Sequence, residues 1–258
     1  MSSTTTALEQ RPIVYPESDG LPMADNTRQF AAIVEIKENL EIQFADEPQV
    51  FVAGNHLWYP VEGNNKLRAA PDAFVVFGVP KGHRGSYRQW EEGGIAPQVV
   101  FEVQSPGNRT AEMTDKFAFY DRYGVEEYYL YDPDEGLWDG WLRHEGQLQR
   151  IESMHNAVSP RLGIRFESEE GTELTLFHPN GDRFLSSVEM DQLRREAVER
   201  AELDRLAREQ SQRRADAADQ RANAADQRAE VADQRAEAAA QRAERLAAQL
   251  RAAGIEPS

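Results

Sequence analysis

The sequence contains no cysteine and no long apolar run. Without cysteine the chain can form neither disulfides nor thiolate metal sites, which fits a reducing compartment. No stretch approaches the roughly 20 apolar residues that a membrane helix needs. The polar start MSSTTTALEQ also lacks the apolar core of a signal peptide. These absences predict a cytoplasmic protein without a membrane segment. Residues 1–12 and 254–258 are predicted to be disordered.

An excess of basic residues is also missing. The formal net charge of the 258 residues is −16, and it is unevenly distributed. Residues 189–258 hold 15 acidic and 13 basic residues, so residues 1–188 hold 30 acidic and 16 basic residues, a net charge of −14. Because attraction to phosphate drives non-specific binding of nucleic acids, this charge disfavours avid binding of that kind. A function on nucleic acid must be reconciled with it.

Proline, glycine and tryptophan nearly disappear after Val188. Twelve of the 13 prolines, 16 of the 17 glycines and all four tryptophans come before it, and Ala, Arg, Gln, Asp and Glu dominate the rest. The change predicts a globular domain at 13–188 followed by a helical tail at 189–253. Alternating strand patterns and at least two helix patterns predict an α/β (α+β) domain with a mixed sheet.

Two local patterns in this domain give more specific predictions. The segment ADNTRQFAAIVEIKENL predicts a helix that carries Phe30, Ile33, Val34 and Lys37 on one face. The segment QVFVAGNHLWYP predicts two short strands that form a hairpin around Gly54-Asn55.

An acidic residue interrupts the strand pattern PQVVFEVQSP. Alternation places Glu102 and Gln104 on one face of this strand and Val103 on the other. A buried carboxylate is costly unless it is paired or bound to a cation. If the strand DAFVVFGVP lies beside it, Asp72 converges on Glu102. The two carboxylates and the carbonyl oxygen of Val103 then predict a site for Mg²⁺ or Mn²⁺ rather than for zinc.

The helix pattern that begins at Thr110 adds a lysine to this site. Met113, Phe117 and Tyr120 form an apolar stripe, and Lys116 falls inside it. We therefore expect the ammonium group to face the sheet, where it can orient a water or stabilise charge on a phosphoryl oxygen. The alternatives are ordinary structural roles: Asp72 as a turn residue after proline, and Lys116 as a surface lysine with a buried stem.

These residues resemble the PD-(D/E)XK nuclease superfamily, with Pro71-Asp72 followed by Glu102-Val103-Gln104. The segments APDAFVVFGVPKG, VVFEVQSPGNR and KFAFYDRYGVEEYYLYDP are similar to the Uma-type family of restriction endonucleases, over roughly residues 15–187. The resemblance implies a restriction-endonuclease-like core of four-stranded mixed sheet flanked by helices. It also implies metal-dependent hydrolysis of DNA phosphodiester bonds.

The resemblance assigns roles to individual residues as well. Asp72 and Glu102 hold the metal, and Lys116 replaces the lysine of the superfamily pattern, at whose position this sequence has Gln104. A further acid from the N-terminal region is implied, for which Glu17 in YPESDG is the candidate and Asp19 the next.

The loop PKGHRGSYRQW offers basic residues that could offset the acidic domain. Lys81, Arg84 and Arg88 are interleaved with Tyr87 and Trp90, a composition that suits contact with phosphates or bases. The alternative is a solvated loop with glycine turns.

The tail repeats every seven residues from Ala218 onward, as ADQRANA, ADQRAEV, ADQRAEA and AAQRAER. Alanines at spacings of four and three form a seam that Leu246 and Leu250 continue, which predicts a coiled coil. The arginines at the edge of the seam have no acid three or four residues away. In a parallel pair of helices Arg221 faces Asp226 of the partner, whereas an antiparallel pair sets arginine against arginine. We therefore predict a parallel homodimer; the alternative is a single solvated helix.

The sequence thus favours a homodimeric, Mg²⁺-dependent endonuclease that acts on DNA. The alternative is a catalytically inactive nuclease fold that serves as a dimeric protein-interaction module, which the charge of the domain favours.

Overall fold

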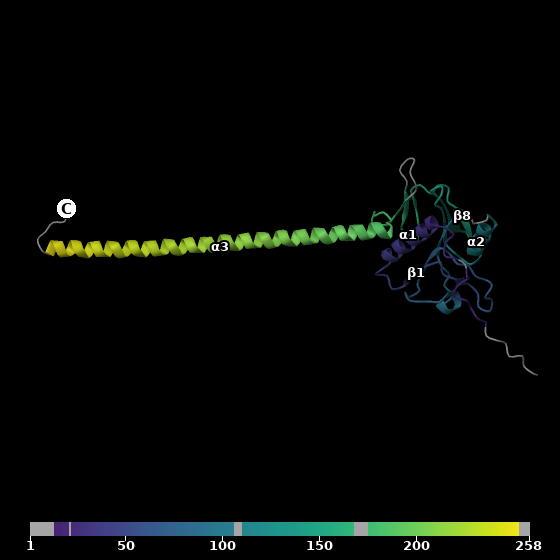
Figure 1. Ribbon diagram of the computed structural model, residues 1–258. Coiled ribbons are helices and arrows are strands. Elements are labelled where there is room, and N and C mark those ends of the chain that lie inside the picture. Colours follow the sequence, from purple (N-terminus) through teal and green to yellow (C-terminus); the bar gives the residue numbers. More distant parts are fainter. Residues whose placement is uncertain (1–12, 21, 106–109, 168–174, 253–258) are drawn as a thin grey trace, which may run out of the picture. The chain divides into compact units, whose positions relative to one another are not determined.

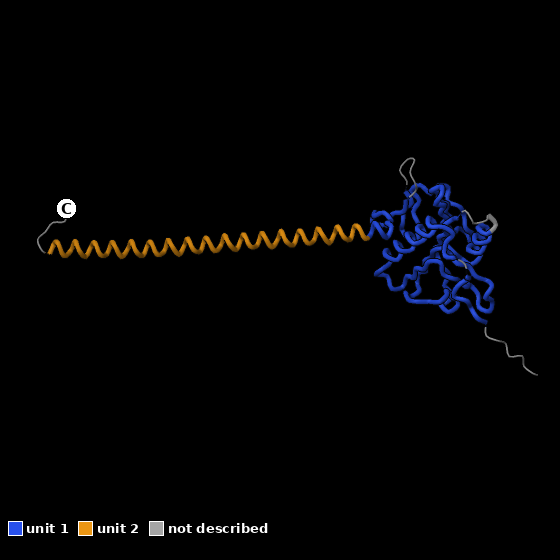
Figure 2. The backbone as a smooth tube through the Cα atoms, in the orientation of Figure 1, with its two compact units in different colours: residues 1–190 blue, residues 191–258 orange. Residues whose placement is uncertain are grey.

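The structure is a computed structural model that describes residues 13–20, 22–105, 110–167 and 175–252. The chain divides into two compact units, residues 1–190 and 191–258 (Figure 2). The segments 1–12 and 254–258, predicted to be disordered, lie outside the described residues. Among the helices that the structure describes, none combines the length and the apolar character needed to cross a membrane.

The first unit contains the mixed set of helices and strands that the sequence predicts (Figure 1). In chain order the elements are α1 (Thr27–Gln43), β1 (Val50–Gly54), β2 (Trp58–Tyr59), β3 (Ala73–Phe77), β4 (Tyr87–Arg88), the 3₁₀ helix η1 (Gln89–Glu92), β5 (Val99–Val103), α2 (Thr110–Arg122), β6 (Glu127–Asp132), β7 (Leu137–His144), β8 (Gln147–Arg150), β9 (Ala157–Val158), β10 (Arg165–Glu167), β11 (Thr175–Phe177) and α3 (Ser187–Ala252).

A mixed sheet forms the centre of this unit. Its strand order is β1-β3-β5-β6-β7-β8, which makes six strands rather than the four that the family resemblance implied. Only β5 and β6 run parallel; the other neighbours in this sheet are antiparallel. Because a parallel pair needs a crossover connection, α2 lies between these two strands in the sequence.

The two helices α1 and α2 pack on opposite faces of this sheet. Ile33 and Leu40 of α1 share one apolar cluster with Phe101 of β5. Tyr120 of α2 shares the other cluster with Val100, the neighbour of Phe101 in the strand. Side chains of β5 alternate between faces, so Glu102 lies on the α2 face together with Val100.

Two predicted details of this unit are wrong. The buried face of α1 carries Ile33, Ile36 and Leu40, whereas Phe30 is 47% exposed. The helix is therefore rotated relative to the predicted stripe. The hairpin around Gly54-Asn55 is also absent from the described residues: β1 pairs with β3 over five residues, and β2 pairs in parallel with β4. The longer and largely buried register with β3 outweighs the local turn signal.

The long helix α3 begins at a capping box. Ser186 accepts a hydrogen bond from the backbone N–H of Glu189, and the Glu189 carboxylate accepts one from the N–H of Ser186 at 2.9 Å. The N–H and the hydroxyl group of Ser186 both donate to this carboxylate and, together with Arg183, lower the pKa of Glu189 to about 2. The helix continues for 66 residues without a buried side chain, as a helical tail would.

Candidate active site

Asp72 and Glu102 lie opposite each other in the central sheet. Strands β3 and β5 are antiparallel and pair Ala73 with Phe101, so the same register sets Asp72 directly across from Glu102. Both side chains point to the α2 face. Asp72 is 7% exposed and Glu102 1% exposed. The pairing on which the predicted site depends is therefore present.

Two side chains from one turn of α2 contact the Glu102 carboxylate. The Lys116 ammonium nitrogen lies 2.7 Å from Oε2, and the Tyr120 hydroxyl donates a hydrogen bond to Oε1. Residues four apart lie on the same helix face, which explains why both reach the same acid. Burial alone would lower the pKa of Lys116, but the carboxylates of Glu102 and Asp72 outweigh it and raise this pKa. Lys116 is therefore a charged lysine beside a buried acid.

A backbone hydrogen bond fixes the Asp72 carboxyl group, and the adjacent Glu102 shifts its pKa. The N–H of Val103 donates a 2.7 Å hydrogen bond to its Oδ2. Burial, followed by the adjacent Glu102 carboxylate, raises the pKa of Asp72 well above its usual range, and Lys116 and the Val103 N–H oppose this rise only in part. The raised pKa means that Asp72 holds a proton more readily than a free aspartate. A cation could take the place of that proton between the two carboxyl groups.

The Val103 carbonyl group meets a residue that the sequence did not reveal. The side-chain amide of Gln29, at the start of α1, donates a 2.9 Å hydrogen bond to this oxygen. Gln29 in turn accepts a hydrogen bond from the N–H of Asp25 at 2.8 Å, and Asn26 caps the helix. The first turn of α1 therefore holds the end of β5. One lone pair of the Val103 carbonyl remains for another ligand.

An open pocket of about 820 Å³ lies beside the acid pair. Acids outnumber bases along its walls, which suits the binding of cations better than direct binding of a polyanion. Its charged lining residues are Asp19, Asp25, Arg68, Asp72, Glu112, Asp115 and Lys116.

The structure places the two N-terminal acids differently. Asp19 lines this pocket, whereas Glu17 is not among the lining residues. The Glu17 side chain lies against the backbone of Gly85, where an added Cβ would collide with it. The structure therefore brings Asp72, Glu102, Val103 and Lys116 together, but does not bring Glu17 to the pocket.

The three basic residues of the 80–90 loop are also outside the pocket lining, and each already forms an ion pair with an acid of the first unit. Arg84 additionally stacks on Phe51, with its guanidinium carbon 4.3 Å from the ring centroid. Contact with DNA would compete with these ion pairs, so this role stays a prediction. The pairs are Lys81 with Glu41 at 3.4 Å, Arg84 with Glu92 at 2.5 Å and Arg88 with Glu91 at 3.1 Å.

The donor set at the acid pair fits a hard divalent cation in part. Within the described ranges, no cluster of three or more His, Asp or Glu side chains could hold a metal ion. Two carboxylates and a carbonyl oxygen nevertheless suit Mg²⁺, which commonly retains several waters and binds proteins through one or two carboxylates. The Glu102 carboxyl oxygens have lone pairs beyond those that accept from Lys116 and Tyr120.

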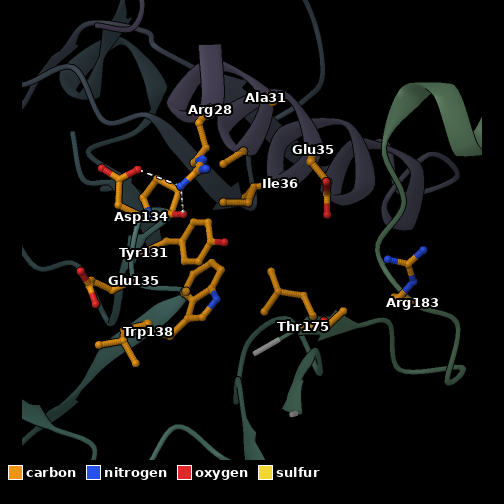
Figure 3. Close-up of a pocket in the computed structure, with 15 residues that line it drawn as sticks. Arg28, Ala31, Glu35, Ile36, Tyr131, Asp134, Glu135, Trp138, Thr175 and Arg183 are labelled. Carbon is orange, nitrogen blue, oxygen red and sulfur yellow. Dashed lines mark hydrogen bonds and ion pairs between the residues drawn. The ribbon is translucent and has the colours of Figure 1, made fainter. Parts of the chain in front are cut away.

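A second pocket, of about 720 Å³, lies on the α1 side of the sheet (Figure 3). Tyr131 and Trp138 stack along it with their ring centroids 4.6 Å apart. Its arginines are paired, Arg28 with Asp134 at 2.9 Å and Arg183 with Glu189. It lacks an opposed pair of buried acids, so we do not assign chemistry to it.

Sequence reasoning missed three residues of the site. Tyr120 was assigned only to an apolar stripe, although its spacing of four from Lys116 could have placed it on Glu102. Gln29 and Arg68 carry no such signal, because they reach the site through tertiary folding. The side chain of Gln104, where the superfamily pattern has lysine, makes no hydrogen bond with the residues that the structure describes.

A mixed sheet flanked by helices, with two opposed acids and a nearby lysine, defines a restriction-endonuclease-like nuclease fold. The chain belongs to the Uma2 family, described as "Putative restriction endonuclease", whose sequence profile matches residues 22–176. No curated protein matches the chain. A crystal structure described as a "putative nuclease belonging to DUF820", from Anabaena variabilis, is similar to it, with 14% identity over 52% of this chain and 72% of that chain and a TM-score of 0.40.

Proposed function

We propose that this protein is an endonuclease that hydrolyses DNA phosphodiester bonds with the help of Mg²⁺ or Mn²⁺. The observation that carries the proposal is the acid pair: Asp72 and Glu102 are buried, face each other across two paired strands and lie next to a lysine. Membership of the Uma2 family supports the same class of activity. The lack of cysteine supports a cytoplasmic location.

The residues at the site would have different roles in this reaction. Asp72, Glu102 and the Val103 carbonyl oxygen would hold the cation, which supplies a water of lowered pKa and polarises the phosphate. Tyr120 and Lys116 keep the Glu102 carboxylate in one orientation. Lys116 retains its proton because its pKa is raised, so it can stabilise negative charge but cannot act as a base.

Cleavage of plasmid DNA tests this proposal. We expect the wild-type protein to nick supercoiled plasmid in Mg²⁺ or Mn²⁺ and to lose this activity in EDTA. Glu102→Gln should reduce nicking to the level of the EDTA control. The matched control is Glu127→Gln, which alters another buried glutamate on the opposite face of the sheet. Equal nicking by wild-type and Glu102→Gln protein would refute the proposal.

A specific observation favours the alternative function as well. Lys116 and Tyr120 already satisfy both oxygens of Glu102, so the acid pair can persist without turnover. The net charge of −14 on residues 1–188 also disfavours DNA. An inactive nuclease fold that acts as a dimeric interaction module would show no nicking under any of these conditions.

For either function we propose that the tail forms a parallel, homodimeric coiled coil. Near the start of α3, arginines pair with acids of the same helix, such as Arg205 with Glu202 at 2.5 Å. In residues 211–252, which the structure describes completely, no ion pair occurs. A parallel partner would supply one, because Arg221 and Arg228 would face Asp226 and Asp233 of the second helix.

Cysteine crosslinking tests the dimer, and the natural lack of cysteine removes any background. Ala229→Cys and Ala243→Cys, both in the seam, should each form a disulfide-linked dimer under mild oxidation. Gln227→Cys, on the outer surface of the repeat, should not. An antiparallel pair could crosslink at one seam position at most, so failure at both positions, or success at only one, would refute the parallel dimer.

A further inference from the structure

Most basic residues of the first unit are committed to ion pairs. Among the described basic residues of 13–190, only Lys66, Arg68 and Arg122 form no ion pair with a described residue. Lys66 and Arg122 are exposed, whereas Arg68 is half-buried. Arg68 is also the only one of the three that lines the pocket beside Asp72 and Glu102. Its unpaired state therefore needs a physical explanation.

The guanidinium group of Arg68 is anchored at one corner. Its Nη1 donates a 3.3 Å hydrogen bond to the hydroxyl oxygen of Tyr59. Tyr59 is fully buried, and its hydroxyl group donates to the carbonyl oxygen of Pro16 at 2.9 Å. An arginine side chain carries five N–H donors. The bond to Tyr59 uses one of them, and the others have no acceptor among the described residues.

The pocket offers no competing cation for an incoming anion. Lys116, the other basic residue in its lining, is bound to Glu102 at 2.7 Å. Although carboxylates dominate the pocket walls, none of those described forms an ion pair with Arg68. The planar fork of a guanidinium group matches the oxygens of a phosphate, which it can bind through two parallel hydrogen bonds.

We infer that Arg68 binds a backbone phosphate of the polynucleotide substrate beside the acid pair. The inference rests on the proposed function and adds the group that brings a polyanion to an acidic pocket. Arg68 would hold a phosphate directly, while the cation bound by the acid pair compensates the charge at the scissile position. Local recognition of this kind is compatible with the net charge of −14 on the domain.

Binding of a fluorescein-labelled DNA duplex to the full-length protein, followed by anisotropy in Ca²⁺, tests the inference. Arg68→Ala should weaken binding about 10- to 100-fold, the effect of losing charged hydrogen bonds. It should also reduce the slope of log Kd against log salt concentration by about 0.9, because one phosphate contact is lost. Arg68→Lys should keep the slope but lose part of the affinity, because lysine keeps the charge without the fork.

The matched control is Lys66→Ala, which removes an unpaired basic residue two positions away that is exposed and outside the pocket lining. We expect its Kd to stay within about twofold of wild type, as for an exposed charge. Circular dichroism melting confirms that each variant is folded. A loss of affinity in Arg68→Ala without a change in salt slope would indicate a structural role and would overturn the inference.

Plasmid nicking by the wild-type protein, measured alongside, separates the two proposals. If the wild-type protein nicks DNA and Arg68→Ala binds the duplex as tightly as Lys66→Ala, the role of Arg68 is refuted and the proposed function stands. If the wild-type protein neither nicks the plasmid nor binds the duplex at low salt, the proposed function fails and the inference fails with it.

Discussion

Glu102 and Glu127 are two buried glutamates on adjacent parallel strands, and they have different surroundings. Glu102 lies near the end of β5 on the α2 face, and Glu127 begins β6 on the opposite face. Their exposed fractions are 1% and 2%. Burial alone therefore does not distinguish a candidate site from a structural acid.

Glu127 is satisfied by neutral donors. The hydroxyl group of Ser159 donates to its carboxylate, as do the backbone N–H of Arg161 at 2.5 Å and the hydroxyl of Tyr129 at 3.0 Å. The Arg161 guanidinium group pairs instead with Glu126 at 2.7 Å. Burial raises the pKa of Glu127, and these hydrogen bonds oppose the rise. The acid ties β6 to the loop around Ser159 and faces no second carboxylate.

Glu102 has what Glu127 lacks. A second acid, Asp72, stands across from it, and the charged Lys116 compensates the pair at the wall of an open pocket. Repulsion between two carboxylates is a cost that a purely structural site has no reason to carry. The contrast teaches that opposed acids beside a pocket, rather than a buried acid as such, indicate a site for a cation.

The largest expected difference between the two glutamates appears when Lys116 is removed. Lys116→Met leaves the acid pair without its cation, and we expect the free energy of unfolding to fall by about 3–5 kcal/mol, as for other broken buried pairs. Millimolar Mn²⁺ should restore part of the loss, because a ligand that binds only the folded state stabilises it. Chemical denaturation with and without Mn²⁺ measures both effects.

The control for this rescue is Ser159→Ala, which disturbs Glu127 instead. Its acid pair and Lys116 are unchanged, so Mn²⁺ should stabilise it no more than it stabilises the wild-type protein, and less than it stabilises Lys116→Met. If Mn²⁺ stabilised both variants equally, or neither of them, the distinction between the two acids would be broken.

A smaller effect separates the hydroxyl donors of the two glutamates. Tyr120→Phe removes the hydroxyl donor to Glu102, and Ser159→Ala removes one of the two hydroxyl donors to Glu127. Each should lower the free energy of unfolding by about 1–3 kcal/mol, since a buried carboxyl group loses a hydrogen bond. Nicking should decrease only in Tyr120→Phe, because only this change frees a carboxylate of the acid pair. Equal nicking per folded molecule by both variants would contradict this expectation.

The sequence predicted the acid pair because the relevant signals are local. Glu102 interrupts an apolar strand, Asp72 opens another, and Lys116 falls inside a helical stripe, so alternation and helical spacing place all three on one side of the sheet. The mixed sheet and the long helix followed from composition and periodicity in the same way. Glu127 gave no signal, because it follows another glutamate at the start of a strand and two of its three hydrogen-bond partners, Ser159 and the Arg161 N–H, lie more than 30 residues away.

The features that the sequence did not predict depend on tertiary contacts. The pairing of β1 with β3 instead of β2 is decided by which strand offers the longer buried register. The contact of Gln29 with the Val103 carbonyl spans 74 residues, and Arg68 reaches the pocket from a loop without periodic structure. Such contacts leave no spacing in the sequence from which they could be inferred.

The smallest effect concerns the pH dependence of stability at Glu127. Burial raises its folded-state pKa above the unfolded value of 4.5. Between these two values the folded state binds the proton more strongly than the unfolded state, so stability falls as the pH rises through this range and levels off above it. Glu127→Gln has no titratable group at this position. The acid pair contributes equally to the pH dependence of stability in both proteins, so its contribution cancels in the difference between them.

The wild-type protein should therefore lose stability relative to Glu127→Gln as the pH rises above 4.5, with a slope no steeper than about 1.4 kcal/mol per pH unit. Urea unfolding at a series of pH values measures the difference. A gain in stability of the wild-type protein over the same range would mean that the donors Ser159, Tyr129 and the Arg161 N–H outweigh burial. The hydrogen bonds would then stabilise Glu127 as a carboxylate. Its pKa would be lowered, in contrast to the raised pKa of Asp72 in the acid pair.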